Sequence, residues 1–159
     1  MTVDVRPVRE DERNWVATLL EERWSGTYMV IRGEVHDLSG APALVALDGD
    51  ERVGLVTYVI RGDECEITSL DSLTPGKGVG SALLQAVGDA ARANGCTQLR
   101  AVTTNDNVDA LRFYQKRGFV LYELHRDAVT RGRALKPSIP WLGCHGIPLR
   151  DELELTRGL

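Results

Sequence analysis

Hydrophobic and polar residues alternate over several short stretches of the chain, a pattern typical of β-strands. The stretch at 52–60 is almost continuously apolar, which favours a central strand. The sequence Asp-Gly-Asp-Glu separates it from the stretch at 43–47 and predicts a hairpin. The stretches expected to be strands are 3–5, 43–47, 52–60, 65–70, 98–104, 119–125 and 149–156.

Apolar residues recur at helical spacing in other stretches. Residues 15–20 and 79–94 each predict an amphipathic helix, and Asp106 or Asn107 is expected to cap a third helix that runs to Lys116. Residues 126–136 also look helical, up to Pro137. Residues 24–42 show neither pattern clearly, so an extended segment and a loop both remain open. We therefore expect one α+β domain over 1–159, with a mixed, mostly antiparallel sheet flanked by helices and an insertion before the last strand.

Composition narrows the classes of function. The chain has 159 residues and a net charge of −4, which argues against a general binder of nucleic acid or anionic membrane. The first ten residues lack the apolar core of a signal peptide, and no apolar run approaches the length of a membrane span. Three scattered cysteines indicate neither a metal site nor a disulfide framework. A cytoplasmic location is expected.

Glycines 76, 78 and 80 come directly before the helix at 79–94. Such a turn points free backbone N–H groups at an anion. The spacing does not fit a Walker A loop, and Ser81 and Leu83 stand where a dinucleotide fingerprint would place its last glycine. A tight turn with no ligand remains an alternative.

Two segments together resemble the GCN5-related N-acetyltransferase (GNAT) family: GKGVGSALL at 76–84 and NVDALRFYQKRGF at 107–119. The resemblance covers roughly residues 43–125 and implies acetyl-CoA as co-substrate, with a small-molecule or peptide amine as acceptor. It also implies a pyrophosphate site on the turn, although the family's Gln or Arg is replaced by Pro75. Lys116 and Arg117 could contact the cofactor phosphates, although a solvated basic helix end is the preferred expectation. The implied cofactor-binding residues are Leu70, Ser72, Leu73, Gly76, Lys77, Gly78, Val79, Gly80, Ser81, Asn107 and Tyr114.

Acyl transfer to an amine needs a base, an oxyanion donor and an acid for the leaving thiolate. The resemblance implies Glu66 or Asp71 as base, on a strand whose bulge would bring both to one side. It implies backbone amides of Leu70, Ser72 or Leu73 as oxyanion donors, and Tyr114 as acid. Alternative roles are a solvent-facing Glu66, an Asp71 that caps the turn, and a Tyr114 that only packs.

We therefore expect direct transfer in a ternary complex, since no cysteine is placed to act as a nucleophile. The rival hypothesis is a non-catalytic acyl-CoA or nucleotide sensor on the same fold, which Pro75 favours. The apolar segment at 135–148 is expected to fold back over the domain, as a substrate lid or a homodimer contact. Trp24 and Tyr28 could line an acceptor pocket. No metal is expected.

Overall fold

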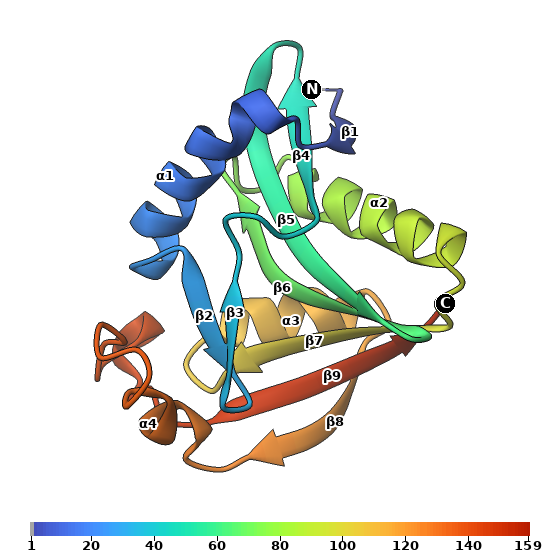
Figure 1. Cartoon of the computed structure of the whole chain (residues 1–159). Coiled ribbons are helices and arrows are strands. Elements are labelled where there is room, and N and C mark those ends of the chain that lie inside the picture. The colour runs from blue at the N-terminus through green and yellow to red at the C-terminus, as the bar shows by residue number, and fades with distance from the viewer. Residues whose placement is uncertain (1) are drawn as a thin grey trace.

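The chain folds around a seven-stranded sheet with the order β1-β4-β5-β6-β7-β9-β8, in a computed structural model that describes residues 2–159 (Figure 1). The neighbours β6 and β7 are parallel, and the other pairs are antiparallel. This confirms the expected mixed sheet. Its strands are β1 (Asp4–Pro7), β4 (Ala43–Asp48), β5 (Glu51–Arg61), β6 (Glu64–Ser72), β7 (Gln98–Thr104), β8 (Val120–His125) and β9 (Glu152–Gly158).

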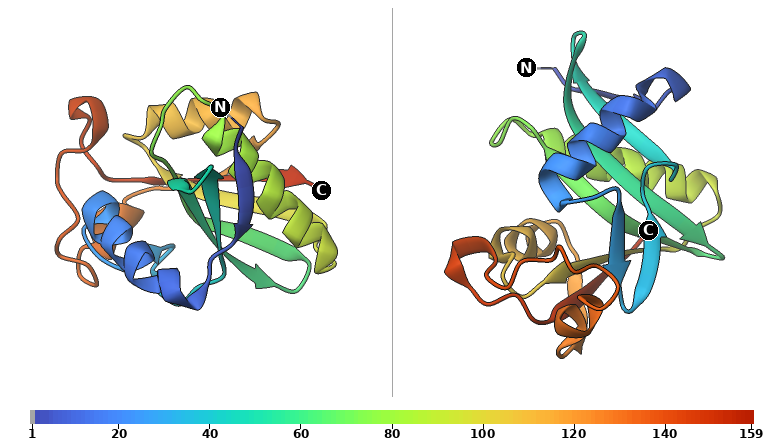
Figure 2. Two further views of the ribbon diagram at one scale, coloured as in Figure 1. Left: turned by 90° about the horizontal axis from the view of Figure 1, so that it is seen from above. Right: turned by 60° about the vertical axis from the view of Figure 1, so that its left-hand side comes forward.

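Helices cover both faces of the sheet (Figure 2). On one face lie α2 (Val79–Ala93) and α3 (Val108–Lys116), close to their predicted bounds. On the other lies α1 (Arg13–Trp24), which follows a short 3-10 turn at Glu10–Glu12. No helix among the described residues is both long and apolar enough to cross a membrane.

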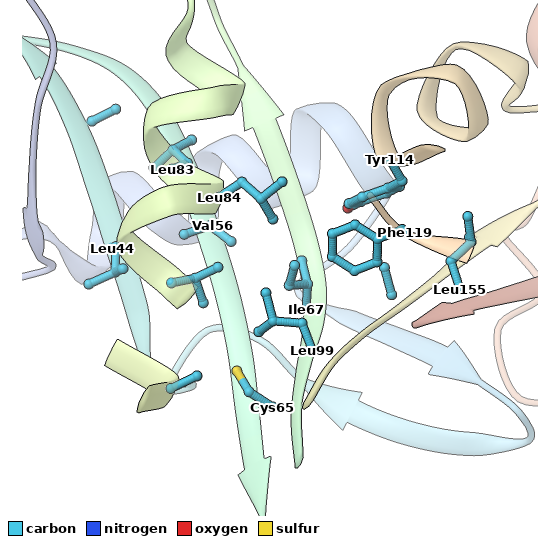
Figure 3. Packing of buried hydrophobic residues seen from close by; sticks show 14 of the residues in the cluster. Leu44, Val56, Cys65, Ile67, Leu83, Leu84, Leu99, Tyr114, Phe119 and Leu155 are labelled. Atoms are coloured by element: carbon cyan, nitrogen blue, oxygen red, sulfur yellow. The ribbon is translucent and has the colours of Figure 1, made fainter. Parts of the chain in front are cut away.

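Each face has its own hydrophobic core. The larger core joins α2 and α3 to the sheet through fully buried leucines such as Leu83 and Leu99, and Figure 3 shows Tyr114 and Phe119 at its edge. The smaller core packs Val16 and Leu20 of α1 against Leu55 of β5. The apolar run of β5 is thus buried from both sides, as its sequence predicts.

Residues 24–42, left open by the sequence, contain a hairpin. Strands β2 (Tyr28–Ile31) and β3 (Glu34–Asp37) pair with each other and lie on the α1 side of the main sheet (Figure 1). Arg32 and Gly33 form the two-residue turn, with φ values of 50° and 76°. Two positive φ values in succession are typical of a type I′ turn, which normally carries Asn-Gly or Asp-Gly.

The predicted helix at 126–136 is wrong in length, because only Ala128–Gly132 (α4) is helical. After Gly132 the chain turns, and the Arg133 guanidinium donates to the carbonyls of Pro140 and Leu149, both at 2.7 Å. These bonds fold residues 133–149 into a compact loop with a 3-10 turn at Cys144–Gly146. The last strand begins at Glu152 rather than 149, since the amides of Arg150 and Asp151 bind the Asn105 side chain.

Strand β6 carries the expected bulge. Ile67 pairs with Tyr58 and Ser69 with Thr57, so Thr68 is an extra residue in β6. A bulge reverses the alternation of side chains beyond it. Glu66 and Asp71 therefore lie on the same face of the sheet, the α1 side, where they contact Arg32 and Trp24 respectively.

Candidate active site

The parallel strands β6 and β7 separate halfway along their length. Their ladder runs from the pair Glu64–Gln98 to the pair Ile67–Ala101 and ends there. Beyond this point a cavity of about 420 Å³ opens between the strands, a volume in the range of small-molecule sites. Its wall includes Thr68 and Leu70 of β6, Val102–Thr104 of β7, and Asn107 and Tyr114 of the α3 region.

The cavity connects the two faces of the sheet. Asn107, Ala110 and Tyr114 approach it from the side of α2 and α3. Trp24 and Met29 approach it from the opposite side, together with Val129 of α4. Two reactants could therefore enter from opposite faces and meet at the gap between β6 and β7.

The glycine turn leads directly into α2 beside this gap. Gly76 and Gly78 have φ values of 78° and 79°, a left-handed conformation that side chains rarely adopt. Residues 75–78 are exposed, and the first amide bonded within the helix is that of Ala82, to Gly78. The amides of Val79, Gly80 and Ser81 have no intrahelical partner, as at any helix start, and can bind an anion.

Gly80 has a second function, in packing. A Cβ atom at this position would lie 3.0 Å from the Phe113 ring of α3. The first turn of α2 and the middle of α3 are therefore in close contact. Gly80 is needed for this approach whether or not an anion binds.

The Arg117 side chain contacts the first turn of α2, and the sequence did not predict this contact. Its guanidinium stacks on Phe113 at 3.8 Å and donates to Ser81 Oγ through Nε at 3.0 Å and Nη2 at 2.8 Å. The α2–α3 contact brings residue 117 back to residue 81, so the half-buried Arg117 is only partly solvated. The only sequence signal was the basic end of the motif at 107–119.

Tyr114 is buried and lies at the cavity wall, where its ring contacts Phe113 and Phe119 edge-on. Figure 3 shows the ring extending from its helix toward the strand that carries Ile67. Burial, together with the nearby Asp71 charge, raises the pKa of Tyr114 well above its ordinary value. The hydroxyl is therefore protonated at neutral pH and can donate a proton or hydrogen bond. Asn107 caps α3 by accepting from the Ala110 amide at 3.1 Å.

The three predicted amide donors of β6 differ in availability. The Leu73 amide donates to the Val53 carbonyl at 2.8 Å and is not free. In an antiparallel ladder the amides alternate in direction, so those of Leu70 and Ser72 face away from β5, toward the gap. Leu70 and Ser72 are therefore the amides that can reach a ligand in the cavity.

The two predicted carboxylates have different surroundings. Glu66 is buried and accepts from Arg32 Nη2 at 2.6 Å. Neither Glu66 nor Asp71 is among the residues that line the cavity. Asp71 accepts from Trp24 Nε1 at 3.0 Å. Burial raises the pKa of Asp71, while the Trp24 hydrogen bond and the nearby Arg23 charge partly offset the shift.

A third carboxylate, Glu152, lines the cavity and was missed by the sequence analysis. It is 5% exposed, and its Oε1 accepts from the Arg32 amide at 2.9 Å. Burial raises the pKa of Glu152. Its only sequence signal was the alternation of Glu and Leu in β9, which is equally typical of a strand with one solvated face.

The segment at 133–149 closes one side of the cavity. Lys136 Nζ donates to the carbonyls of Trp24 at 2.7 Å and Tyr28 at 2.8 Å, and the Cys144 amide donates to Asp106 Oδ2 at 2.8 Å. The segment thus folds back over the domain, as its apolar sequence predicts. Burial and Asp106 raise the pKa of the Cys144 thiol, which disfavours the nucleophilic thiolate.

Glu123, His125 and Glu154 form a grouping whose ligand atoms lie within 4.8 Å of one another. Glu154 already pairs with Arg32, Arg100 and His125. Two guanidinium groups at one carboxylate make the location unfavourable for a cation. We assign no metal site to it.

Sequence comparison identifies the family. The model of the acetyltransferase (GNAT) family matches residues 9–119, which include the glycine turn, the gap between β6 and β7, and α3. The chain belongs to the GNAT acetyltransferase family. This confirms the resemblance seen in the two sequence motifs and supports acyl transfer as the general chemistry of the fold.

Two relatives from Bacillus subtilis (strain 168) are similar to this GNAT protein over nearly their whole length. The uncharacterized protein YxbD is 39% identical over 158 residues and covers 99% of both chains. The uncharacterized protein YdhI is 37% identical over 152 residues and covers 95% of both chains. The similarity therefore extends over nearly the whole of each chain.

Solved structures show the same fold. An IAA acetyltransferase from Bacillus cereus ATCC 14579 superposes with a TM-score of 0.77 at 24% identity, covering 99% of this chain and 100% of that chain. A Bacillus subtilis acetyltransferase in complex with CoA gives a TM-score of 0.71 at 20% identity, covering 99% of both chains. A GNAT family acetyltransferase from Elizabethkingia anophelis with acetyl-CoA bound gives 0.69 at 18% identity, covering 99% and 98%.

Proposed function

We propose that this protein is an acetyl-CoA-dependent N-acetyltransferase that acetylates a primary amine by direct attack in a ternary complex. The observation that carries the proposal is the cavity between β6 and β7, which opens beside the glycine turn and reaches both faces of the sheet. Related structures that contain CoA or acetyl-CoA support the choice of co-substrate.

The pyrophosphate of the cofactor would bind the first turn of α2. The amides of Val79, Gly80 and Ser81 provide the donors, and the helix dipole favours negative charge there. Pro75 supplies no side-chain donor, but Arg117 places a guanidinium at Ser81. Arg117 therefore offers a positive charge at the first turn of α2.

The acetyl thioester would lie in the gap, near Tyr114. A carboxylate takes one proton from the acceptor ammonium, and the free amine then attacks the thioester carbonyl. The amide of Leu70 or Ser72 stabilises the oxyanion. The intermediate collapses by breaking the C–S bond, and Tyr114 gives its proton to the departing thiolate. The attacking nitrogen loses its second proton as the amide forms, and this proton returns Tyr114 to its neutral form. Of the two predicted bases, Asp71 is the one whose charge acts on Tyr114, which favours it over Glu66.

The acceptor would approach from the α1 side, past Trp24 and α4. A cytoplasmic location remains part of the proposal, supported by the free cysteines Cys65, Cys96 and Cys144.

The test is a turnover assay with acetyl-CoA and a set of primary amines, which measures free thiol and the mass of the acetylated amine. Amine-dependent thiol release with one acetyl group added per product supports the proposal. Tight binding of acetyl-CoA without turnover of any amine would instead favour the sensor hypothesis. Failure to bind acetyl-CoA would contradict both.

A further inference from the structure

Glu152 stands apart from the other buried glutamates near the hairpin. Glu66 pairs with Arg32, and Glu154 pairs with both Arg32 and Arg100. Glu152 has no salt bridge among the described residues, although only 5% of its surface is exposed. Among the described residues, its side chain accepts one hydrogen bond, from the Arg32 backbone amide.

A buried carboxylate without a cation is costly, so it either takes up a proton or finds a partner. The guanidinium groups of Arg32 and Arg100 form no ion pair with Glu152. They already bind three other glutamates, which are Glu64, Glu66 and Glu154. Four glutamates thus share two arginines, and this group of side chains has an excess of negative charge. A ligand that brings a positive charge into the cavity would reduce this excess.

The rest of the cavity wall is mostly apolar on the α1 side. Met29, Val30 and Ile31 of β2 face it, and Val129 of α4 and Ile139 lie across from them. The rim is apolar as well, since Leu142 is 62% exposed and belongs to the wall. Such a surface binds a hydrocarbon body and offers few partners for a second polar group.

Two cations also belong to the wall, but both are poorly placed for an anionic group. The ammonium of Lys136 is bound by the carbonyls of Trp24 and Tyr28. Arg23 is exposed at the end of α1, where solvent weakens its interactions. Neither side chain offers a buried, free donor for a carboxylate of the acceptor.

We propose that the acceptor is a small primary amine with an apolar body, whose ammonium group pairs with the Glu152 carboxylate inside the cavity. This inference rests on the proposed function. The apolar body would contact β2 and α4, and the nitrogen would point toward the gap between β6 and β7. A cavity of about 420 Å³ must also hold the acetyl end of the cofactor, so the acceptor is small.

The first experiment compares four amines with acetyl-CoA: 2-phenylethylamine, putrescine, leucine and a tetrapeptide with a free N-terminus. We expect kcat/KM for 2-phenylethylamine to exceed each of the others at least about tenfold, because a second charged group finds no free partner in the wall. Asp106, the other carboxylate of the wall, already accepts from the Thr104 hydroxyl and the Cys144 amide. A preference for leucine, putrescine or the peptide would overturn the substrate class but leave the acetyltransferase function standing. Acetyl-CoA binding with no amine acetylated would contradict the proposed function itself.

The second experiment uses Glu152→Gln, which keeps an oxygen for the Arg32 amide and removes the charge. Loss of a charged partner should raise KM for 2-phenylethylamine about 10- to 100-fold and leave KM for acetyl-CoA within about twofold. The matched control is Glu123→Gln on the exposed part of β8, outside the cavity wall, which should change neither. An unchanged KM for the amine in Glu152→Gln would overturn the assignment.

A third variant tests the apolar wall independently of the charge. Val129→Phe would narrow the cavity from the α4 side and should reduce kcat/KM for 2-phenylethylamine more than for methylamine. Equal effects on both amines, with acetyl-CoA binding intact, would place the apolar body elsewhere and overturn the proposal.

Discussion

Trp24 Nε1 donates a hydrogen bond to Asp71 Oδ2 at 3.0 Å, which joins the end of α1 to the strand at the centre of the candidate site. The bond fixes the orientation of a carboxylate that is otherwise deeply buried, with 6% of its surface exposed. Asp71 is therefore held in place by a neutral donor and not, among the described residues, by an ion pair, and the nearby Arg23 charge offsets its burial only in part.

This relationship predicts opposite effects of Asp71→Asn on stability and on turnover. Burial raises the pKa of Asp71 in the folded state above its unfolded value. The contribution of the carboxyl to stability is then greatest below the unfolded pKa and is lost as pH rises through the folded pKa. Asn keeps an oxygen for Trp24, so the variant should melt at a higher temperature than the parent at pH 7–8, and the difference should shrink toward pH 4.

Turnover of Asp71→Asn tests whether the carboxylate is the base. We expect a loss of about 10²- to 10⁴-fold at neutral pH, with recovery at high pH, where the amine (pKa about 10.4) deprotonates by itself. Glu66→Gln is the comparison, since Glu66 is the other predicted base and is already paired with Arg32. If Glu66→Gln shows that pH profile and Asp71→Asn does not, Glu66 is the base. Parent-like profiles in both variants would exclude both residues.

Ser81→Asp should weaken acetyl-CoA binding without unfolding the protein. An acidic residue in the first turn of α2 favours the helix and can pair with Arg117, but it repels the cofactor pyrophosphate. We expect the Kd from titration calorimetry to rise at least about tenfold. Ser81→Asn is the control of similar size without charge. Gly80 is less suited to this test, since any side chain there meets Phe113. An affinity unchanged by Ser81→Asp would refute the phosphate site.

Tyr114→Phe should separate the acid role from packing. Phenylalanine keeps the edge contacts with Phe113 and Phe119 and removes the hydroxyl alone. Because a thiolate leaves readily, we expect turnover to fall by about 10²-fold, the low end for general acid catalysis, and acetyl-CoA affinity to stay within a few-fold. Single-turnover rates and calorimetry on one preparation give both values. Full activity of the Tyr114→Phe variant would show that the Tyr114 side chain serves only in packing.

The hydrogen bonds of Glu12, a residue outside the candidate active site, predict a contribution to the stability of the fold that is lost in acid. It is 1% exposed and accepts from Arg6 at 2.6 Å, Arg52 at 2.9 Å and the Arg9 amide at 2.9 Å. These donors hold the pKa of Glu12 far below its ordinary value, so its stabilisation is present above the unfolded pKa and is lost as pH falls.

Glu12→Gln should lower the free energy of unfolding at pH 7 by about 1–3 kcal/mol, since it weakens three hydrogen bonds to a buried carboxylate while the two arginines stay partly solvated. Urea unfolding at pH 7 and pH 3 provides the measurement. The stability difference between parent and variant should be smaller at pH 3. A constant difference would contradict the lowered pKa.

Much of the main sheet was predictable because its strands follow local rules. The alternation at 98–104 matches β7 at both ends, and Gly95 and Gly118 follow the helices that they were expected to end. The β2–β3 hairpin was not predictable, because Arg32 occupies a left-handed turn position that usually carries Asn or Asp. Distant ion pairs with Glu66 and Glu154 hold Arg32 there.

The same hairpin explains why the acceptor side of the site was missed. Glu152 alternates with apolar residues in β9, and sequence alone does not reveal that a hairpin 120 residues earlier in the chain buries this face. The proposed cofactor side depends on a local motif that starts a helix, so the sequence alone is enough to nominate its residues. Arg117 and Trp24 come from separate elements, and only the packing of α2 on α3 and of α1 on β6 brings them to the site.

Strand β9 lies between β7 and β8, although it follows both of them in the chain. During folding, β8 therefore cannot join the sheet by pairing with a strand that precedes it, and residues 152–158 must arrive before that edge can form. Pairing over so long a sequence separation has a high entropic cost and slows folding. Because Glu152 is the first residue of this strand, the proposed acceptor wall is expected to form late, after the glycine turn and α2 already have their neighbours. A chain in which β9 has not yet paired would thus already have the proposed phosphate site, but not the proposed amine site.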